Sequence, residues 1–322
     1  MRNRSQSSVV IQLALVLCMS VRLHADSAAD EYGKQAMRHL NEISTITGSR
    51  ATGSPGAERA AEYLVDQLSS YGYEVERVPF TAHRKGTVYQ CKNLFARKNN
   101  SDTNKTILIC AHYDLAASNG LGADDNASGV AVLLALAESA MNLESKCSLV
   151  FAFFDAEEMG MKGSSDYIRK LTADQLSSLS LVINIDSLLA GDYVYLHRGE
   201  GNDLATQTRM LCVASAFGYE LVLQPGNHPD FPAGTVSGMG DYAPFDEAGV
   251  PFLAFEATNW DKGELDGYIQ TDESRGKGGE IWHTKFDTLE YIESYAPGRA
   301  VKRLGGLVLV LYDFIFDKTM EL

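Results

Sequence analysis

Residues 106–114 read TILICAHYD, a hydrophobic run that ends in a histidine and an aspartate. Two later segments have the same form: the run over residues 148–154 leads into DAEE at residues 155–158, and the run over residues 180–185 leads into Asp186. Short, continuous apolar runs of this kind are typical of strands that are covered on both faces. Each of the three predicted strands therefore ends in side chains that can bind metal or transfer protons.

Helical segments lie between these strands. The small and aliphatic residues 128–141 predict a buried helix, and Ser54 and Pro55 supply a cap and a first-turn proline for a helix that ends near Ser70. Further elements expected are helices over residues 30–43, 164–171, 203–217 and 300–314, and strands over residues 73–80 and 87–96 and near Glu220 and Phe252. Helices that alternate with apolar strands predict an α/β fold, in which a mostly parallel central sheet carries helices on both faces.

The chain has 322 residues, of which 45% are hydrophobic and 22% are charged, and its formal net charge is −14. This composition is that of a folded globular protein and excludes a low-complexity or wholly disordered chain. The acidic balance argues against nucleic-acid binding, because phosphate contacts require an excess of Lys and Arg. No repeat, linker or change of composition divides the chain, so we expect one domain over residues 26–322 and a monomeric protein.

The first 25 residues have the pattern of a secretory signal peptide. Arg2 and Arg4 precede a mostly apolar stretch over residues 9–21, and Ala25 offers a small residue at the cleavage point. The stretch is too short for an ordinary membrane span, although a retained anchor is the alternative. We therefore expect export to the periplasm or the extracellular space, with no membrane attachment after cleavage.

Four cysteines follow the signal peptide, and three of them lie in or beside apolar segments. An oxidising compartment permits disulfides, but a chain of this length does not need them to stay folded. Buried free thiols and disulfides both remain open for Cys91, Cys110, Cys147 and Cys212.

Reactive groups collect where the carboxyl ends of parallel strands meet. That edge would bring together His112, Asp186 and the acids of residues 155–158, with the loop GADDNASG over residues 122–129 beside them and His283 further along the chain. Taken singly, these residues have ordinary interpretations as surface, capping or solvated groups. Together, imidazoles and carboxylates without thiolates suit Zn²⁺ or a related divalent metal, and the excess of acids over histidines indicates two ions rather than one.

The order of these motifs resembles the di-zinc exopeptidases of the bacterial leucyl aminopeptidase type, the twenty-eighth family of metallopeptidases. The resemblance extends from residues 50–53 (RATG) to residues 283–288 (HTKFDT) and covers nearly all of the chain after the signal peptide. Four further segments are more narrowly similar to the alkaline phosphatase isozyme conversion aminopeptidases: residues 181–192, 255–260, 267–270 and 297–299.

This resemblance implies a single-domain zinc-exopeptidase fold and hydrolysis of the N-terminal peptide bond of peptides or proteins. It implies two Zn²⁺ ions per chain, although other divalent metals would suit the same ligands. His112 and Asp186 would hold one ion, and Glu158 and His283 would hold the other. Asp124 would bridge the two ions.

The resemblance also implies roles for residues that do not touch the metals. Glu157 would be the general base, and Asp114 would accept the second ring proton of His112. Asp287 would support the loop that carries His283, and the peptide bond between Asp124 and Asp125 would be cis. The chain departs from the family pattern after Asp241, where Tyr242 stands in place of the histidine of many relatives.

Three alternative functions remain. A glutaminyl cyclase-like transferase would use a single zinc and would not need His112 and Asp186 as ligands. A catalytically inactive binding module of the same fold would have lost a ligand or Glu157, and no such loss is present. A carboxypeptidase-like relative would need an inserted domain between Asp186 and His283, an interval that predicted core elements already occupy.

The preferred N-terminal residue of the substrate is less constrained by the sequence. A basic residue is favoured by the acidic chain and by the narrower resemblance. Seven acids precede His283 and are candidates for a pocket wall, although they are equally typical of solvated loops: Asp230, Asp241, Asp246, Glu247, Asp261, Glu264 and Asp266.

Overall fold

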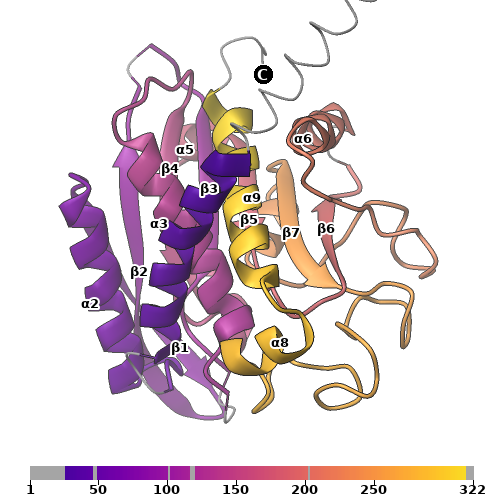
Figure 1. Cartoon of the computed structure of the whole chain (residues 1–322). Coiled ribbons are helices and arrows are strands. Elements are labelled where there is room, and N and C mark those ends of the chain that lie inside the picture. Colours follow the sequence, from indigo (N-terminus) through magenta and orange to yellow (C-terminus); the bar gives the residue numbers. More distant parts are fainter. Residues whose placement is uncertain (1–25, 46–48, 101, 117–119, 202–203, 317–322) are drawn as a thin grey trace, which may run out of the picture.

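The computed structural model describes residues 26–45, 49–100, 102–116, 120–201 and 204–316 (Figure 1), so the expected signal peptide lies outside the described residues. The strands of this part of the chain form a single sheet, ordered β1-β2-β4-β3-β5-β7-β6. Their bounds are β1 (Val75–Arg84), β2 (Thr87–Lys98), β3 (Thr106–His112), β4 (Ser148–Phe154), β5 (Leu179–Ile185), β6 (Tyr193–Arg198) and β7 (Phe252–Thr258).

The four central strands, β4, β3, β5 and β7, are parallel to one another. Their buried runs are those that the apolar segments predict, because a strand covered on both faces has no polar side. Antiparallel pairing adds β2 and β1 at one edge and β6 at the other. The carboxyl ends of β3, β4, β5 and β7 therefore meet at one edge of the sheet, where the chemically active residues were expected.

Helices cover both faces of the sheet, as predicted. Residues 26–45 are helical, and the helices that follow are α2 (Pro55–Ser70), α3 (Gly129–Ala140), α4 (Lys162–Lys170), α5 (Ala173–Ser178), α6 (Leu204–Ala216), α7 (Ala243–Glu247), α8 (Leu289–Tyr295) and α9 (Arg299–Phe316). In Figure 1, α2, α3 and α9 lie in front of the sheet, and their buried residues form one core cluster with those of residues 26–45. The second core lies on the opposite face, where α4, α5 and α7 pack.

Sequence patterns locate most of these elements to within a few residues. Ser54 caps α2 as expected, because its hydroxyl accepts the backbone N–H of Ala57 at 3.1 Å. No strand forms at Glu220, where the structure has only an isolated bridge between Tyr195 and Val222. The edge strand β6 and the short helices α5, α7 and α8 were not predicted, since their few residues show no clear apolar period.

The four cysteines of the described chain are unpaired, with Cys91, Cys110 and Cys147 buried and Cys212 exposed. In the same part of the chain, no helix combines the length and the hydrophobicity needed to cross a membrane.

Candidate metal centre

His112, the last residue of β3, is buried at the carboxyl edge of the sheet and faces three carboxylates. Its Nε2 lies 3.2 Å from Oδ1 of Asp125 and 3.5 Å from Oδ1 of Asp186, which follows β5 directly. Its Nδ1 faces Oδ1 of Asp114 at 3.5 Å. Burial opposes a positive charge on the ring, but the carboxylates, Asp186 foremost, raise the pKa of His112 well above its usual value.

A second group forms around His283. Its Nε2 lies 3.1 Å from Oδ2 of Asp125 and 3.1 Å from Oε2 of Glu158. Hydrogen bonds to Asp125 and Glu158 raise the pKa of His283 to about 11. Asp125 thus directs one carboxylate oxygen toward each histidine and belongs to both groups.

The expectation that Asp124 lies between the two groups is wrong by one residue, because Asp125 occupies that position. The carboxylate of Asp124 points into the protein, where it accepts the backbone N–H groups of Leu189 at 2.6 Å and Ala190 at 3.1 Å. The side chain of Gln270 donates to its other oxygen at 2.7 Å. The cis peptide bond is likewise displaced by one residue, to Asp125–Asn126.

The turn that carries Asp125 is held against the end of β5. The side chain of Asn126 donates to the carbonyl oxygen of Ile185 at 2.9 Å and accepts the N–H of Gly129 at 2.9 Å. A Cβ at residue 129 would lie 2.3 Å from the same Ile185 oxygen, so only glycine permits this approach. The turn is thereby fixed with Asp125 beside Asp186.

Asp114 organises the residues that follow β4. Its Oδ1 accepts the backbone N–H of Glu157 at 3.0 Å, and its Oδ2 accepts that of Glu158 at 3.3 Å and the hydroxyl of Thr52 at 3.0 Å. Because Oδ1 also faces Nδ1 of His112, one buried carboxylate orients a histidine and both glutamates. Asp114 and His112 thus face one another, and the role of Asp114 as acceptor of the ring proton stays a prediction.

The two glutamates have different surroundings. Oε1 of Glu158 accepts the N–H of Ala116 at 2.8 Å, while its Oε2 faces His283. Glu157 lines the same cleft as the two histidines, and its carboxylate makes none of the hydrogen bonds found among the described residues. Burial raises the pKa of Glu158 to about 7 and that of Glu157 well above its usual value.

Three further residues support the centre. For one of them the sequence implied a different role, and for the other two it implied none. Asp287 accepts the N–H groups of Asp124 at 2.7 Å and Asp125 at 3.1 Å, so it supports the turn of the shared aspartate. Gln270 joins Asp124 to the N–H groups of Ile281 and Trp282, just before His283; a buried glutamine carries no such signal in its sequence. Arg50 is fully buried and donates to four carbonyl groups, those of Ile43, Tyr113, Leu121 and Gly122.

The cleft next to these groups has a volume of about 150 Å³ and is lined by residues from β5, β6 and β7. Of the seven acids expected in a pocket wall, only Asp266 is among the described residues that line it. Asp241 is buried instead, and its Oδ1 accepts the hydroxyl of Ser164 at 2.6 Å. Glu256, which the sequence did not single out, does line the cleft, and burial together with the charge of Asp186 raises its pKa to about 8.

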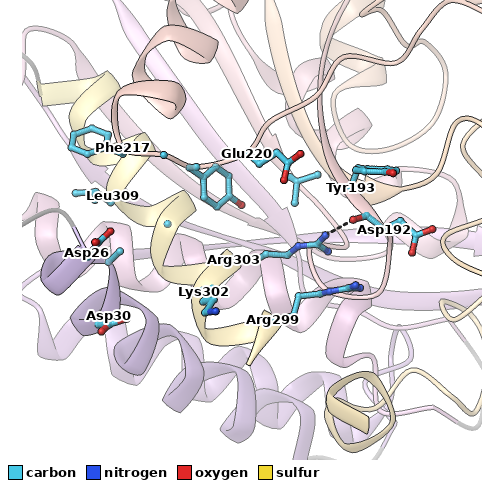
Figure 2. Close-up of a pocket in the computed structure, with 15 residues that line it drawn as sticks. Asp26, Asp30, Asp192, Tyr193, Phe217, Glu220, Arg299, Lys302, Arg303 and Leu309 are labelled. Carbon is cyan, nitrogen blue, oxygen red and sulfur yellow. Dashed lines mark hydrogen bonds between the residues drawn. The ribbon is translucent and has the colours of Figure 1, made fainter. Parts of the chain in front are cut away.

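A larger cavity, with a volume of about 540 Å³, lies elsewhere and contains none of these side chains (Figure 2). Arg299 and Arg303 of α9 project into it, but their guanidinium groups are bonded to backbone carbonyls of residues 188–192. That segment supplies the N–H groups that bind Asp124. The arginines at this cavity therefore brace the segment behind the candidate centre.

The donor atoms suit a divalent metal. His112, Asp125 and Asp186 each offer one ligand atom within 4.8 Å of the others, and so do Asp125, Glu158 and His283. Each group combines one imidazole nitrogen with two carboxylate oxygens, and three protein ligands leave a coordination position for water or substrate. A shared carboxylate between two such groups is the arrangement of a two-metal site.

An α/β fold with paired imidazole–carboxylate groups at the carboxyl edge of its sheet is typical of a metal-dependent enzyme. Residues 93–307 match the model of Peptidase family M28, and the chain therefore belongs to that family. The resemblance expected from the sequence motifs is confirmed.

One relative agrees with this assignment, and two solved structures share the fold. The chain is 29% identical over 330 residues to the alkaline phosphatase isozyme conversion protein of Escherichia coli K12, covering 94% of this chain and 95% of that one. The zinc aminopeptidase BSAP of Bacillus subtilis superposes with a TM-score of 0.70 at 14% identity, covering 90% and 96% of the two chains. A glutaminyl cyclase of Fimbriiglobus ruber has the same fold, with a TM-score of 0.66 at 19% identity over 88% and 94%.

Proposed function

We propose that this protein is a zinc-dependent aminopeptidase that hydrolyses the N-terminal peptide bond of peptides or proteins with two metal ions. The observation that carries the proposal is Asp125, whose two oxygens face two histidines that each have a further carboxylate partner. His112 and Asp186 would hold one ion, and Glu158 and His283 would hold the other. The family membership and the zinc aminopeptidase fold of BSAP support the choice of reaction and metal.

The chemistry divides between the metals and the side chains. Divalent cations bound here would lower the pKa of water and polarise the carbonyl group of the scissile bond. Glu157 would take the proton from that water and deliver it to the amine that leaves. The carboxylate of Glu157 lines the cleft without a hydrogen bond among the described residues, which supports this role. The carboxylate of Glu158 contacts Ala116 and His283, which supports the role of a ligand.

Asp114 would act through the residues that it orients. By accepting the N–H groups of Glu157 and Glu158, it holds the backbone that carries both the base and the ligand. By facing Nδ1 of His112, it favours the tautomer in which Nε2 is free to bind metal.

We further propose that the enzyme is exported to the periplasm or extracellular space after removal of residues 1–25, and that it prefers a basic N-terminal residue. The signal-peptide pattern supports the first statement. The acidic cleft and the full-length similarity to the isozyme conversion protein support the second.

The function is tested with a panel of aminoacyl p-nitroanilides, with and without a chelator, alongside metal analysis. We expect cleavage that the chelator abolishes and that added zinc restores. N-terminal glutaminyl peptides in the same experiment test the cyclase alternative. Cyclisation of glutamine without anilide hydrolysis would contradict the aminopeptidase proposal.

A further inference from the structure

The cleft continues from the candidate metal centre along one face of the sheet. The last paired residues of the parallel strands are Cys110 with Asn184 and Ile185 with Phe255. When the same pairing is continued past these residues, His112, Asp186 and Glu256 lie side by side at the strand ends. Alternate residues of a strand share a face, so the row beneath them on the same face contains Asn184 of β5 and Ala254 of β7. His112, Asn184 and Ala254 are buried. The row of the three strand-end residues borders the cleft.

The lower row ends in His197 of the edge strand β6. His197 pairs with Ala254 across the strands, whereas Tyr195 pairs with Glu256, so both pairs lie on the same face. Because Ala254 has only a methyl group, the space above it is left open, and Val236 and Tyr242 form further walls. The two rows are about 6.6 Å apart along the strands, a distance that a four-carbon lysine stem can cover.

His197 is the unusual group of this hollow. Its side chain is 1% exposed, lines the cleft, and has no hydrogen-bond partner for either ring nitrogen among the described residues. The ring stacks on Tyr195 with an interplanar angle of 11°, and it also lies 5.5 Å from the ring of Trp260. A buried imidazole with two unsatisfied nitrogens is costly unless a ligand completes its hydrogen bonds.

Glu256 supplies an acidic group beside this ring, and a cation bound there would favour its ionised form. Its Oε2 lies 3.9 Å from Nε2 of His197, and its side chain remains 30% exposed to the cleft. No Lys or Arg is among the described residues that line the cleft, so no cation of the chain neutralises this carboxylate there. The hollow therefore contains an acid and a ring nitrogen without a partner among the described residues. A ligand that suits both has hydrogen-bond donors and a positive charge.

We propose that Glu256 and His197 bind the cationic side chain of an N-terminal Arg or Lys and determine the substrate preference of the enzyme. This inference rests on the aminopeptidase function proposed above. The volume of about 150 Å³ is far below that of most small-molecule sites and suits one side chain rather than an extended peptide. The residue that enters lies next to the strand-end row, so its carbonyl group remains at the metal centre.

The test compares Arg, Lys and Leu p-nitroanilides in the zinc-loaded full chain. Glu256→Gln should lower kcat/KM for the Arg and Lys substrates about 30-fold or more, with less than a threefold change for Leu. His197→Phe keeps the stacked ring and should lower kcat/KM for Arg about three- to tenfold. Glu264→Gln is the matched control, because this nearby exposed acid does not line the cleft and should leave all three substrates unchanged.

Product inhibition provides a second measurement, independent of basic-substrate turnover. L-Arginine should inhibit Leu p-nitroanilide hydrolysis more strongly than L-leucine does, and Glu256→Gln should remove that difference. If Glu256→Gln does not fold, Glu256→Asp keeps the charge and should give a smaller, Arg-selective loss.

An equal loss for Arg and Leu in Glu256→Gln would overturn the inference, because it would place the carboxylate against the α-amine or in the support of the metal centre. Equal wild-type rates for Arg and Leu would also overturn it, while leaving the aminopeptidase function intact. Absence of chelator-sensitive cleavage of every anilide would instead contradict the proposed function itself.

Discussion

Asp125 and His283 lie 3.1 Å apart, Oδ2 to Nε2, although they stand on turns that are distant in the sequence. The other oxygen of Asp125 lies 3.2 Å from His112, so this carboxylate is the one group common to both halves of the candidate centre. Its neighbour Asp124 is also buried but accepts hydrogen bonds from the backbone of residues 189 and 190. Asp125 and Asp124 thus have different roles, and substitutions can distinguish them.

Asp125→Asn should retain fewer than two zinc ions per chain after dialysis, because an amide is a poorer bridge than a carboxylate. Asp124→Asn should retain both ions but lower the free energy of unfolding by about 1–3 kcal/mol, since its amide group would face N–H donors. Metal analysis and urea unfolding measure the two effects. Full zinc content in Asp125→Asn, with zinc lost from a folded Asp124→Asn, would reverse the assignment.

The neighbouring glutamates offer a similar comparison. Glu157→Gln should keep the fold and both metals yet lose turnover by roughly 10²–10⁴-fold, the usual contribution of a positioned general base. Glu158→Gln should lose metal as well as activity, because its carboxylate faces His283. The measurements are kcat and zinc content of each variant. Near-normal turnover in a fully loaded Glu157→Gln would exclude it as the base.

Asp114→Asn should reduce zinc affinity or kcat by about 10- to 100-fold without touching a metal, because it disturbs the orientation of His112 and of both glutamates. Thr52→Val removes only the hydroxyl that donates to Asp114 and should have a much smaller effect. Zinc titration and steady-state kinetics distinguish the two variants. Wild-type behaviour in Asp114→Asn would show that this orientation is unimportant.

The burial of His39, which is not among the residues that line the cleft, predicts an acid-sensitive contribution to stability. Burial, with a smaller effect of Arg38, lowers the pKa of this ring to about 4, and it contacts the hydroxyls of Tyr63 at 2.7 Å and Tyr71 at 3.1 Å. Between about pH 6.5 and pH 4 the unfolded chain binds the extra proton, so stability falls as the pH falls, by at most about 1.4 kcal/mol per pH unit.

His39→Gln should flatten this part of the stability profile, measured by urea unfolding at a series of pH values. The variant removes the titrating ring, so the change of stability with pH, rather than the stability at one pH, is compared with that of the wild type. Identical slopes for wild type and variant from pH 6.5 to pH 4 would contradict the prediction.

Substitution of Arg303 tests whether this side chain stabilises residues 188–192, the segment behind the metal centre. Its guanidinium group donates to the carbonyls of Leu188, Leu189, Gly191 and Asp192 (Figure 2 shows the contact with Asp192). Arg303→Met should lower the free energy of unfolding by about 1–3 kcal/mol, since carbonyls lose their donors. Lys302→Met, on an exposed neighbour, should change it by less than about 0.5 kcal/mol. Equal stability of the two variants would remove the bracing role.

The sequence predicts the centre because its strands are continuous apolar runs that end at reactive residues. His112 and Asp186 can be placed at one edge from the strand pattern alone. The choice between Asp124 and Asp125 cannot be made this way, because a turn decides which of two adjacent acids points outward. Here that decision depends on Asp287, Asn126 and the backbone of residues 189 and 190.

Local sequence patterns also do not predict which residues form the wall of the cleft. Glu256 lies within an otherwise apolar strand, and His197 lies in an edge strand of six residues that shows no period. Their proximity follows from antiparallel pairing between β6 and β7, which joins residues far apart in the chain. The acid-rich loops before His283 contribute only Asp266 to the described lining.

The two-metal assignment is tested most directly by a crystal structure of the zinc-loaded protein with anomalous diffraction at the zinc edge. Two peaks are expected, one in contact with His112 and Asp186 and the other with Glu158 and His283, with Asp125 touching both. A single peak, or a zinc ion bound to Asp124 with Asp125 unligated, would contradict it.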